Sequence, residues 1–448
     1  MPAFIREAPA TLRLALPIIA GQVSQMLMGV TDSVMIGRVG RVPLAASAFA
    51  NSLFGVVFIV GLGLLLPVSV LVARAHGARQ PQECAQYLRH GLVLALGIGL
   101  TELAAVAVLS TQMHRFGQPP EVVAAVNPFF LLIGASLLPV YLFQALKQFS
   151  EALGRAWAPM AILLGAVVLN AFLNWVLIYG HLGAPALGLT GAGLATLVAR
   201  SAAAAGLWCW LHARAEMRED WPEKWIASLS RRRLREMLGI GVPASVQLLF
   251  ETGTFLAAAL MMGWMGTVSL AAHQIALSCV SFTFMFPLGL ATAVSMRVSR
   301  AVGEGRHEVL RPIGFGGLGM GMCIMGLFAG VFMLAGRWIA AGFTPETEVA
   351  ALAAQLLFVA GIFQIFDGGQ VIGAAALRGL SDVRVPTVLT FVAYWLVSLP
   401  GGYALAFPLG WGPLGIWGGL AAGLACAAAL LGLRFARQTR PGIMSTIS

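Results

Sequence analysis

Four acidic side chains stand inside long apolar stretches of the chain, where charged residues are otherwise scarce: Asp32, Glu102, Glu251 and Asp367. A charge at the depth of a bilayer costs about 3 kcal/mol on insertion scales, so it usually faces an interior cavity or an internal partner. These four carboxylates are therefore the first candidates for binding a positively charged species. Hydrogen-bonded packing of the neutral acid is the structural alternative for each of them.

Amide side chains accompany two of the acids. Gln247 precedes Glu251 by four residues, which places both on one helical face, and Gln364 and Gln370 flank Asp367 at three residues on either side. Carboxylate and amide oxygens are typical ligands of hard cations such as Na⁺. A carboxylate withdrawn from water holds a proton equally well. We predict that Glu251 and Asp367, helped by Gln247, bind a small cation, either Na⁺ or H⁺.

The other two acids have different neighbours. Asn170 and Asn174 stand four residues apart on one helical face, and their amides would either bond Asp32 or join helices to each other. Glu102 has no supporting polar pattern, and Arg200 is its candidate partner. We expect Asp32 to contact a bound ion or organic ligand, and Asn170 and Asn174 to contribute to the same site.

Aromatic side chains stand close to the acids in the sequence. Phe250 precedes Glu251, and Phe363 and Phe366 precede Asp367. Aromatic rings attract flat, apolar cations through stacking and cation–π contacts. We predict that these three rings, together with Gln370, contact a substrate of this kind, while other aromatic residues pack in the core or face lipid.

The composition excludes most soluble proteins. Of the 448 residues, 59% are hydrophobic and 10% are charged, whereas about 25% charged is usual for soluble domains. A net charge of +10 would suggest nucleic-acid binding in a soluble protein, but here the basic residues flank apolar segments, so we exclude nucleic acid as a partner. The five cysteines are scattered, so neither a disulfide framework nor a zinc site is expected. No cofactor is expected.

Twelve apolar runs are long enough to cross a bilayer as helices. Their approximate bounds are 14–37, 46–72, 91–111, 125–146, 158–180, 187–210, 239–262, 271–297, 313–336, 351–377, 386–408 and 412–434. With the N-terminus in the cytoplasm, 23 of the 28 basic residues fall on inner flanks. This asymmetry predicts that both termini are cytoplasmic. Lys147, Glu151 and Arg155, after the fourth run, are expected in a solvated inner loop.

The two halves of the chain resemble each other. Residues 37–77 and 263–303 are identical at 18 of 41 positions when the sequence is shifted by 226 residues, and the same shift pairs Pro17 with Pro243. Six spans per half predict a parallel duplication, which is found in secondary transporters with the substrate between the halves. We place the halves at residues 1–225 and 226–448, joined by the basic segment 211–238. Pro17 and Pro243 are candidate hinges.

Together these residues resemble the multidrug and toxic compound extrusion (MATE) family, in its NorM-type bacterial branch. The resemblance covers essentially the whole chain. Its motifs are Gln247-x-x-Phe250-Glu251, Phe366-Asp367 with Gln370, Gly29-x-x-Asp32, Asn170-x-x-x-Asn174 and the repeated Gly/Leu-Ala-Ala segments. The Gly368-Gly369 pair after Asp367 departs from the bulkier residue expected there.

The resemblance implies an all-α membrane protein with twelve transmembrane helices in two pseudo-symmetric six-helix bundles around a V-shaped central cleft. It also implies Na⁺- or H⁺-coupled antiport that exports cationic amphipathic compounds by alternating access. In this scheme Glu251 and Asp367 form the cation site of the C-terminal half, and Asp32 belongs to a coupling or substrate site of the N-terminal half. We expect a monomer in the lipid bilayer of a bacterial inner membrane.

Two other functions are compatible with some of these features. A lipid or oligosaccharide flippase of the same broad superfamily would need a basic cleft for anionic phosphate, but basic residues are nearly absent from the apolar runs. A membrane-embedded enzyme would need a nucleophile with its base, or a metal cluster. His273, the one His expected in the helical core, has no Cys or acid at useful spacing, so we do not expect an enzyme.

Overall fold

All regular secondary structure is helical in the part that the computed structural model describes, residues 3–222, 224–225 and 228–440. Twelve helical segments in that part are long and apolar enough to cross a membrane, which confirms the predicted number. Their bounds are Arg6–Gly37, Arg41–Gly77, Pro81–Thr111, Pro120–Ala152, Trp157–Tyr179, Gly188–Ala213, Arg231–Trp264, Thr267–Gly303, His307–Phe343, Thr347–Gly379, Arg384–Ala406 and Pro413–Gln438. Each exceeds the roughly 20 residues needed to span a bilayer, so the chain is a multi-pass membrane protein.

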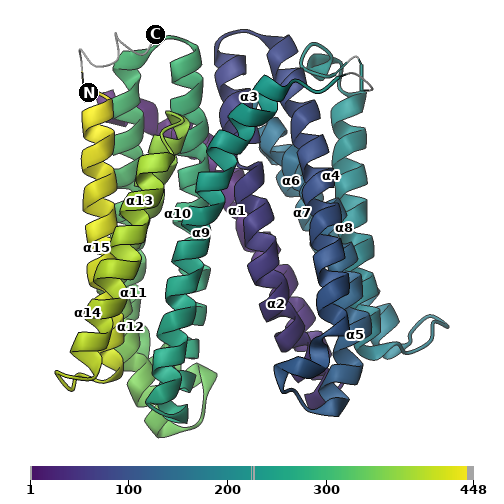
Figure 1. Ribbon diagram of the computed structural model, residues 1–448, viewed down its shortest axis with the longest axis vertical. Coiled ribbons are helices and arrows are strands. Elements are labelled where there is room, and N and C mark those ends of the chain that lie inside the picture. Colours follow the sequence, from purple (N-terminus) through teal and green to yellow (C-terminus); the bar gives the residue numbers. More distant parts are fainter. Residues whose placement is uncertain (1–2, 223, 226–227, 441–448) are drawn as a thin grey trace. The chain divides into compact units, whose positions relative to one another are not determined.

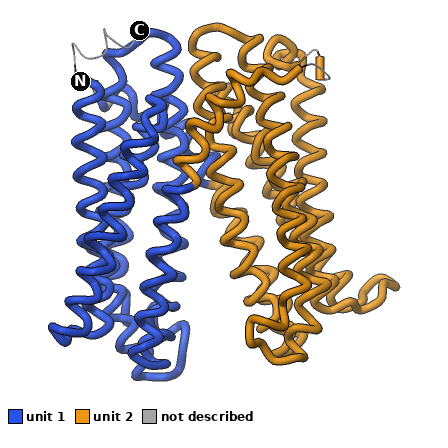
Figure 2. Tube along the Cα trace, in the orientation of Figure 1, with its two compact units in different colours: residues 1–19, 246–448 blue, residues 20–245 orange. Residues whose placement is uncertain are grey.

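The chain divides into two compact units, which Figure 2 draws in different colours. Unit 2 comprises residues 20–245, and unit 1 comprises residues 1–19 and 246–448. Unit 2 holds most of α1 (Ala3–Gly37), α2 (Arg41–Leu65), α3 (Pro67–Gly77), α4 (Pro81–Thr111), α5 (Pro120–Ala135), α6 (Leu137–Ala152), α7 (Trp157–Tyr179), α8 (Gly188–Ala213) and the start of α9 (Arg231–Trp264) (Figure 1). Unit 1 holds the rest of α9, α10 (Thr267–Gly303), α11 (Leu310–Phe343), α12 (Thr347–Gly379), α13 (Arg384–Phe391), α14 (Leu399–Ala406) and α15 (Pro413–Gln438).

Two helices contribute residues to both units. The unit boundary in α1 follows residue 19, and the boundary in α9 follows residue 245. Pro17 and Pro243 lie inside these helices, two residues before the respective boundaries. Since proline removes a backbone hydrogen bond, each helix has a weakened point there. The expectation that these prolines act as hinges stays a prediction.

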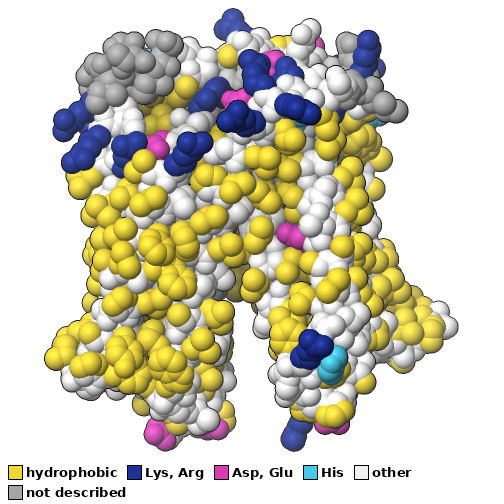
Figure 3. All heavy atoms as spheres, viewed as in Figure 1, with side chains coloured by type: hydrophobic (Ala, Val, Ile, Leu, Met, Phe, Trp, Pro, Cys, Tyr) yellow, Lys and Arg dark blue, Asp and Glu magenta, His cyan; other side chains and the backbone are white. Residues whose placement is uncertain are grey.

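Lys and Arg side chains gather at one end of each unit (Figure 3). In unit 1 this is the end at which α1 begins and α15 ends (Figure 1). The long sides of each unit are largely apolar in the same view, as expected for surfaces that face lipid.

Breaks in the helical backbone divide several crossing segments. α2 gives way to α3 at Leu66, because Pro67 cannot donate the hydrogen bond that would continue the helix. α13 passes through a π-helical turn, Val392–Ser398, into α14. Such wide turns often accompany functional sites, and this one carries Tyr394 and Ser398, which are both buried.

The end of α6 corrects one expectation. Lys147 and Glu151 do not lie in a solvated loop: they are 4% and 2% exposed, and their side chains form an ion pair at 3.8 Å. α6 continues to Ala152 and packs there among α3, α4 and α8. The sequence shows where an apolar run ends, but not that the next helical turn remains covered by other helices.

Glycines on one face of α15 allow close packing against the neighbouring segment. Gly415, Gly419 and Gly423 follow each other at intervals of four residues. A Cβ atom at Gly419 would lie 2.3 Å from Gly402 Cα, and one at Gly423 would lie 2.4 Å from Ser398 Cβ. Small residues at this spacing let the backbones of two membrane helices approach closely.

Gly419→Ala is therefore expected to destabilise the protein. Ala normally stabilises a helix by about 0.5–1 kcal/mol relative to Gly, but here the added methyl group would force α15 away from α14, at a cost of about 1–3 kcal/mol. The thermal unfolding midpoint of the purified variant in detergent should fall. Gly432→Ala is the matched control, because its Cβ meets nothing within 4 Å; equal midpoints for the two variants would contradict this packing.

Candidate functional site

The carboxylate of Asp32, on α1, accepts hydrogen bonds from side chains on α7 and α8. Its Oδ1 accepts a hydrogen bond from Asn174 Nδ2 at 2.5 Å, and its Oδ2 accepts one from Thr196 Oγ1 at 3.3 Å. Asn174 Nδ2 also donates to Asn170 Oδ1 at 3.3 Å, and both asparagines are completely buried. Of the two alternatives for these amides, the bond to Asp32 is thus present. Asn174 Oδ1 has no hydrogen-bond partner among the described residues.

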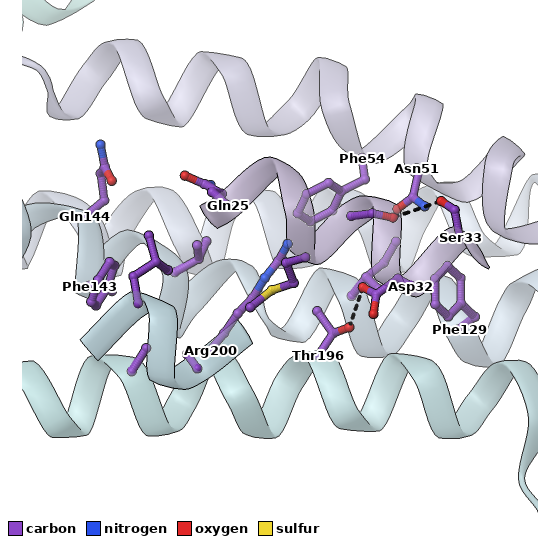
Figure 4. A pocket seen from close by; sticks show the side chains of 17 residues that line it. Gln25, Asp32, Ser33, Asn51, Phe54, Phe129, Phe143, Gln144, Thr196 and Arg200 are labelled. Carbon is purple, nitrogen blue, oxygen red and sulfur yellow. Dashed lines mark hydrogen bonds between the residues drawn. The ribbon is translucent and has the colours of Figure 1, made fainter. Parts of the chain in front are cut away.

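Asp32 faces a cavity of about 390 Å³ within unit 2. Six helices line it, and Figure 4 shows the side chains around it. Ten of the 17 residues that line it are apolar or glycine, including Phe54 and Phe129, and the other seven, among them Gln25, Asn51, Gln144 and Arg200, are polar or charged. A concave, mainly apolar site with a few convergent polar groups is typical of a small-molecule binding pocket.

Arg200 lies in this cavity wall and does not pair with Glu102, so that expected pairing is wrong. Its Nη1 donates to Ser136 Oγ at 2.7 Å, and its guanidinium lies 5.2 Å from the centre of the Phe54 ring. It is also near enough to Asp32 for the two opposite charges to attract each other. The pocket therefore contains one acidic and one basic side chain.

Glu102 is held by a neutral partner away from the cavity lining. The Tyr141 hydroxyl donates to Glu102 Oε2 at 2.5 Å. Tyr141 is completely buried and Glu102 is 8% exposed. The environment of Glu102 therefore matches hydrogen-bonded packing of a buried acid and not a binding site, because internal hydrogen bonding makes a buried carboxyl tolerable.

The other two acids lie in unit 1. Asp367, on α12, is 3% exposed, and Gln364 and Gln370 on the same helix are 0% and 1% exposed. Glu251, on α9, is half-buried and close enough for its charge to act on Asp367. The guanidinium of Arg378 attracts the Glu251 carboxylate. The two acids predicted to bind the coupling cation are therefore near each other.

Several buried oxygen atoms on α12 and on the segment from α13 through the π-turn lack hydrogen bonds within the described part of the chain. They are Gln364 Oε1, Gln370 Oε1, Thr390 Oγ1, Tyr394 Oη and Ser398 Oγ. Tyr394 is close enough to Glu251 and Asp367 for both carboxylates to interact electrostatically with its hydroxyl. Buried polar groups are normally paired, so this concentration of unsatisfied oxygens is unusual. It would suit a hard cation, which takes oxygen ligands.

Sequence reasoning missed the contribution of the segment around the π-turn. Thr390, Tyr394 and Ser398 repeat at four-residue intervals, which places them on one helical face. This polar stripe within an apolar span was the available signal. Arg378 was missed because it stands at the very end of its apolar run.

The predicted aromatic residues occupy different environments. Phe250 packs against Phe391 with ring centres 5.0 Å apart. Phe363 is fully buried and lies 5.6 Å from Trp417, whereas Phe366 is 37% exposed. Their roles in substrate binding, like that of Gln247, which is 9% exposed, stay predictions.

A family model described as MatE matches the chain twice, over residues 17–176 and 243–404. The two matches begin at Pro17 and Pro243, which are separated by the same 226 residues that align the two halves of the sequence. Together they cover more than half of the chain.

Curated relatives match nearly the whole length. A probable multidrug resistance protein NorM of Pseudomonas putida is 38% identical over 434 residues, covering 96% of this chain and 94% of the relative. The one from Agrobacterium fabrum is 36% identical, covering 95% and 93%. The multidrug resistance protein NorM of Burkholderia vietnamiensis is 37% identical, covering 98% and 96%.

Solved structures share the fold at lower identity. A eukaryotic MATE transporter gives a TM-score of 0.88 at 22% identity, covering 98% of this chain and 99% of that one. An outward-facing multidrug resistance MATE family transporter gives 0.89 at 21%, covering 96% of both chains. The predicted helical membrane fold is thereby confirmed. On the strength of the double family match and the full-length relatives, the chain belongs to the multidrug and toxic compound extrusion family, in its NorM-type branch.

Proposed function

We propose that this protein is a cation-coupled multidrug efflux antiporter that exports cationic amphipathic compounds by alternating access, driven by Na⁺ or H⁺. It works as a monomer in a bacterial inner membrane with both termini in the cytoplasm. The names of its relatives support multidrug efflux. The observation that carries the proposal is the Asp32 carboxylate in a largely apolar cavity.

The electrostatic attraction between Asp32 and Arg200 provides a way to exchange two cations. With Asp32 ionised, its negative charge balances Arg200, and the aromatic wall can accept a flat cation. Once a proton or Na⁺ neutralises Asp32, the uncompensated charge of Arg200 repels a cationic substrate. Binding of the coupling ion therefore lowers the affinity for the substrate, and binding of the substrate lowers the affinity for the ion. Antiport requires such a difference in affinity between conformational states.

The acidic pair of unit 1 supplies a second place for the coupling ion. A cation between Glu251 and Asp367 would relieve their mutual repulsion and would give the unpaired oxygens of Gln364 and Gln370 a partner.

A flippase of lipids or oligosaccharides is the second candidate function. Arg200 favours it, because a guanidinium in the pocket wall is suited to an anionic phosphate. Against it stands Asp32 in the same cavity, since a carboxylate repels phosphate. Antiport of cations accounts for both residues.

Asp32→Asn is expected to reduce gradient-driven ethidium efflux from proteoliposomes to the background rate. Asn keeps one side-chain oxygen to accept from Asn174, and its amide NH2 can donate to Thr196 Oγ1, whose hydroxyl then donates only to the Ala192 carbonyl, so the fold should survive while the charge is lost. Glu102→Gln is the matched control, because it neutralises a buried acid outside the cavity lining. Equal loss in both variants, or no loss in Asp32→Asn, would count against the assigned substrate site.

Glu251→Gln and Asp367→Asn should each abolish coupling. Neutral amides cannot gain or release a proton and bind Na⁺ more weakly, so neither ion gradient should accelerate efflux. Expression and the thermal midpoint should remain near those of the wild type. Asp382→Asn, which weakens the 2.8 Å ion pair with Arg434 elsewhere in unit 1, should keep coupled transport. Normal ion-driven efflux in both site variants would refute the cation site.

Imposing one gradient at a time identifies the driving ion. Proteoliposomes with an inward Na⁺ gradient alone, or a pH gradient alone, should show ethidium export with one of the two. A parallel set measures translocation of a fluorescent anionic phospholipid. Lipid translocation without ethidium export would favour the flippase and overturn the antiporter.

A further inference from the structure

Three side chains with metal-ligating atoms converge in unit 2, away from both acidic sites. They are His76 near the end of α3, Cys84 near the start of α4, and Asp220 in the segment between α8 and α9. Among the described residues, one ligand atom from each lies within 4.8 Å of the other two. No zinc site was expected from the sequence, because the three residues come from separate segments and form no short motif.

The donor set has the chemistry of a transition-metal site. Imidazole nitrogen, thiolate sulfur and carboxylate oxygen are the three protein ligands of Zn²⁺. Bond lengths of about 2.0–2.3 Å in a tetrahedron bring ligand atoms to roughly 3.3–3.8 Å from each other, so the side chains would need to close by about 1 Å. A thiolate and a carboxylate together neutralise a divalent ion, which makes its burial tolerable.

The cluster is partly withdrawn from water. Cys84 is completely buried, while His76 and Asp220 are half-buried. Burial raises the pKa of the Asp220 carboxyl, and the neighbouring His76 and the hydrogen bond with Cys84 oppose this rise. The Cys84 thiol also lies 3.7 Å from the carbonyl oxygen of Val72. The thiol and the carboxyl are thus already in contact with each other.

The segment between α8 and α9, which carries Asp220, also packs against α4 and α8. The Trp221 ring lies 5.2 Å from that of Trp208. Arg89 Nη2 donates to the carbonyl oxygen of Ser228 at 2.9 Å, and the backbone N–H of Ser230 donates to His90 Nε2 at 2.9 Å. The backbone around Asp220 is therefore held against unit 2 before any metal binds, which lowers the entropy cost of binding.

The geometry points to a binding site for one borderline-soft divalent metal, Zn²⁺ or a similar ion, formed by His76, Cys84 and Asp220. The fourth coordination position is left to water. On binding, the Cys84 thiol releases its proton to solvent and its sulfur bonds the metal. The ion would tie the segment before α9 to the turn between α3 and α4, and it is independent of the ion that drives transport.

Co²⁺ is the probe for this site, because its spectrum reports thiolate ligation. The full-length protein, purified in detergent with any affinity tag removed, should bind one Co²⁺ per chain with a Kd of about 1 µM or tighter. A sulfur-to-cobalt charge-transfer band should appear and should be displaced by Zn²⁺. Cys84→Ser should abolish the band, and His76→Gln and Asp220→Asn should weaken binding at least about tenfold.

Cys323→Ser is the matched control, since Cys323 is an exposed thiol in unit 1, and it should retain the band. Folding is monitored separately through the thermal midpoint. Zn²⁺ should raise the midpoint of the wild type and of Cys323→Ser, but not that of Cys84→Ser. Zn²⁺ should also slow trypsin cleavage after Arg218 in the wild type. Absence of stoichiometric Co²⁺ binding, or a thiolate band that persists in Cys84→Ser, would overturn the proposal.

Discussion

Every charged side chain that this protein carries into the bilayer must find its partner inside the protein, because hydrocarbon offers none. Some of these partners are permanent. The Tyr141 hydroxyl bonds Glu102, and Lys147 forms an ion pair with Glu151. For such groups, burial and pairing account for the residue without any further function. The acids at the candidate sites differ in that their surroundings leave buried oxygen atoms without partners, so a mobile cation can supply what the fixed structure does not.

The two halves share a scaffold but differ in where they carry charge. Under the 226-residue shift, Glu251 corresponds to Gln25, and Asp32 corresponds to Ala258. Gln25 lines the Asp32 cavity in unit 2, while Ala258 is completely buried in the core of unit 1. Duplication thus supplied two similar helical frames, and substitution within them separated a cavity suited to an organic cation from an acidic pair suited to a small ion. This division of roles is the core of the proposed antiport.

Most of the fold could be predicted from the sequence, because apolar length and the placement of basic residues follow directly from the bilayer. The acids and their amide neighbours were also accessible, since four-residue spacing shows which side chains share a helical face. The bond between Asp32 and Asn174 was one of two alternatives that this spacing left open. What could not be predicted depends on contacts between distant segments. Glu102 meets Tyr141 rather than Arg200, and the π-turn that carries Tyr394 is a backbone distortion that hydropathy does not report.

The central claim is that substrate and coupling ion oppose each other through carboxylates buried in the membrane, and equilibrium binding tests it most directly. The affinity of the purified protein for ethidium should be measured across a range of Na⁺ concentrations at fixed pH and across a range of pH at fixed Na⁺. Because linkage is reciprocal, the account predicts that saturation with one of these ions raises the ethidium Kd at least about tenfold, equivalent to about 1.4 kcal/mol. An ethidium Kd that is the same at every Na⁺ concentration and every pH would contradict it.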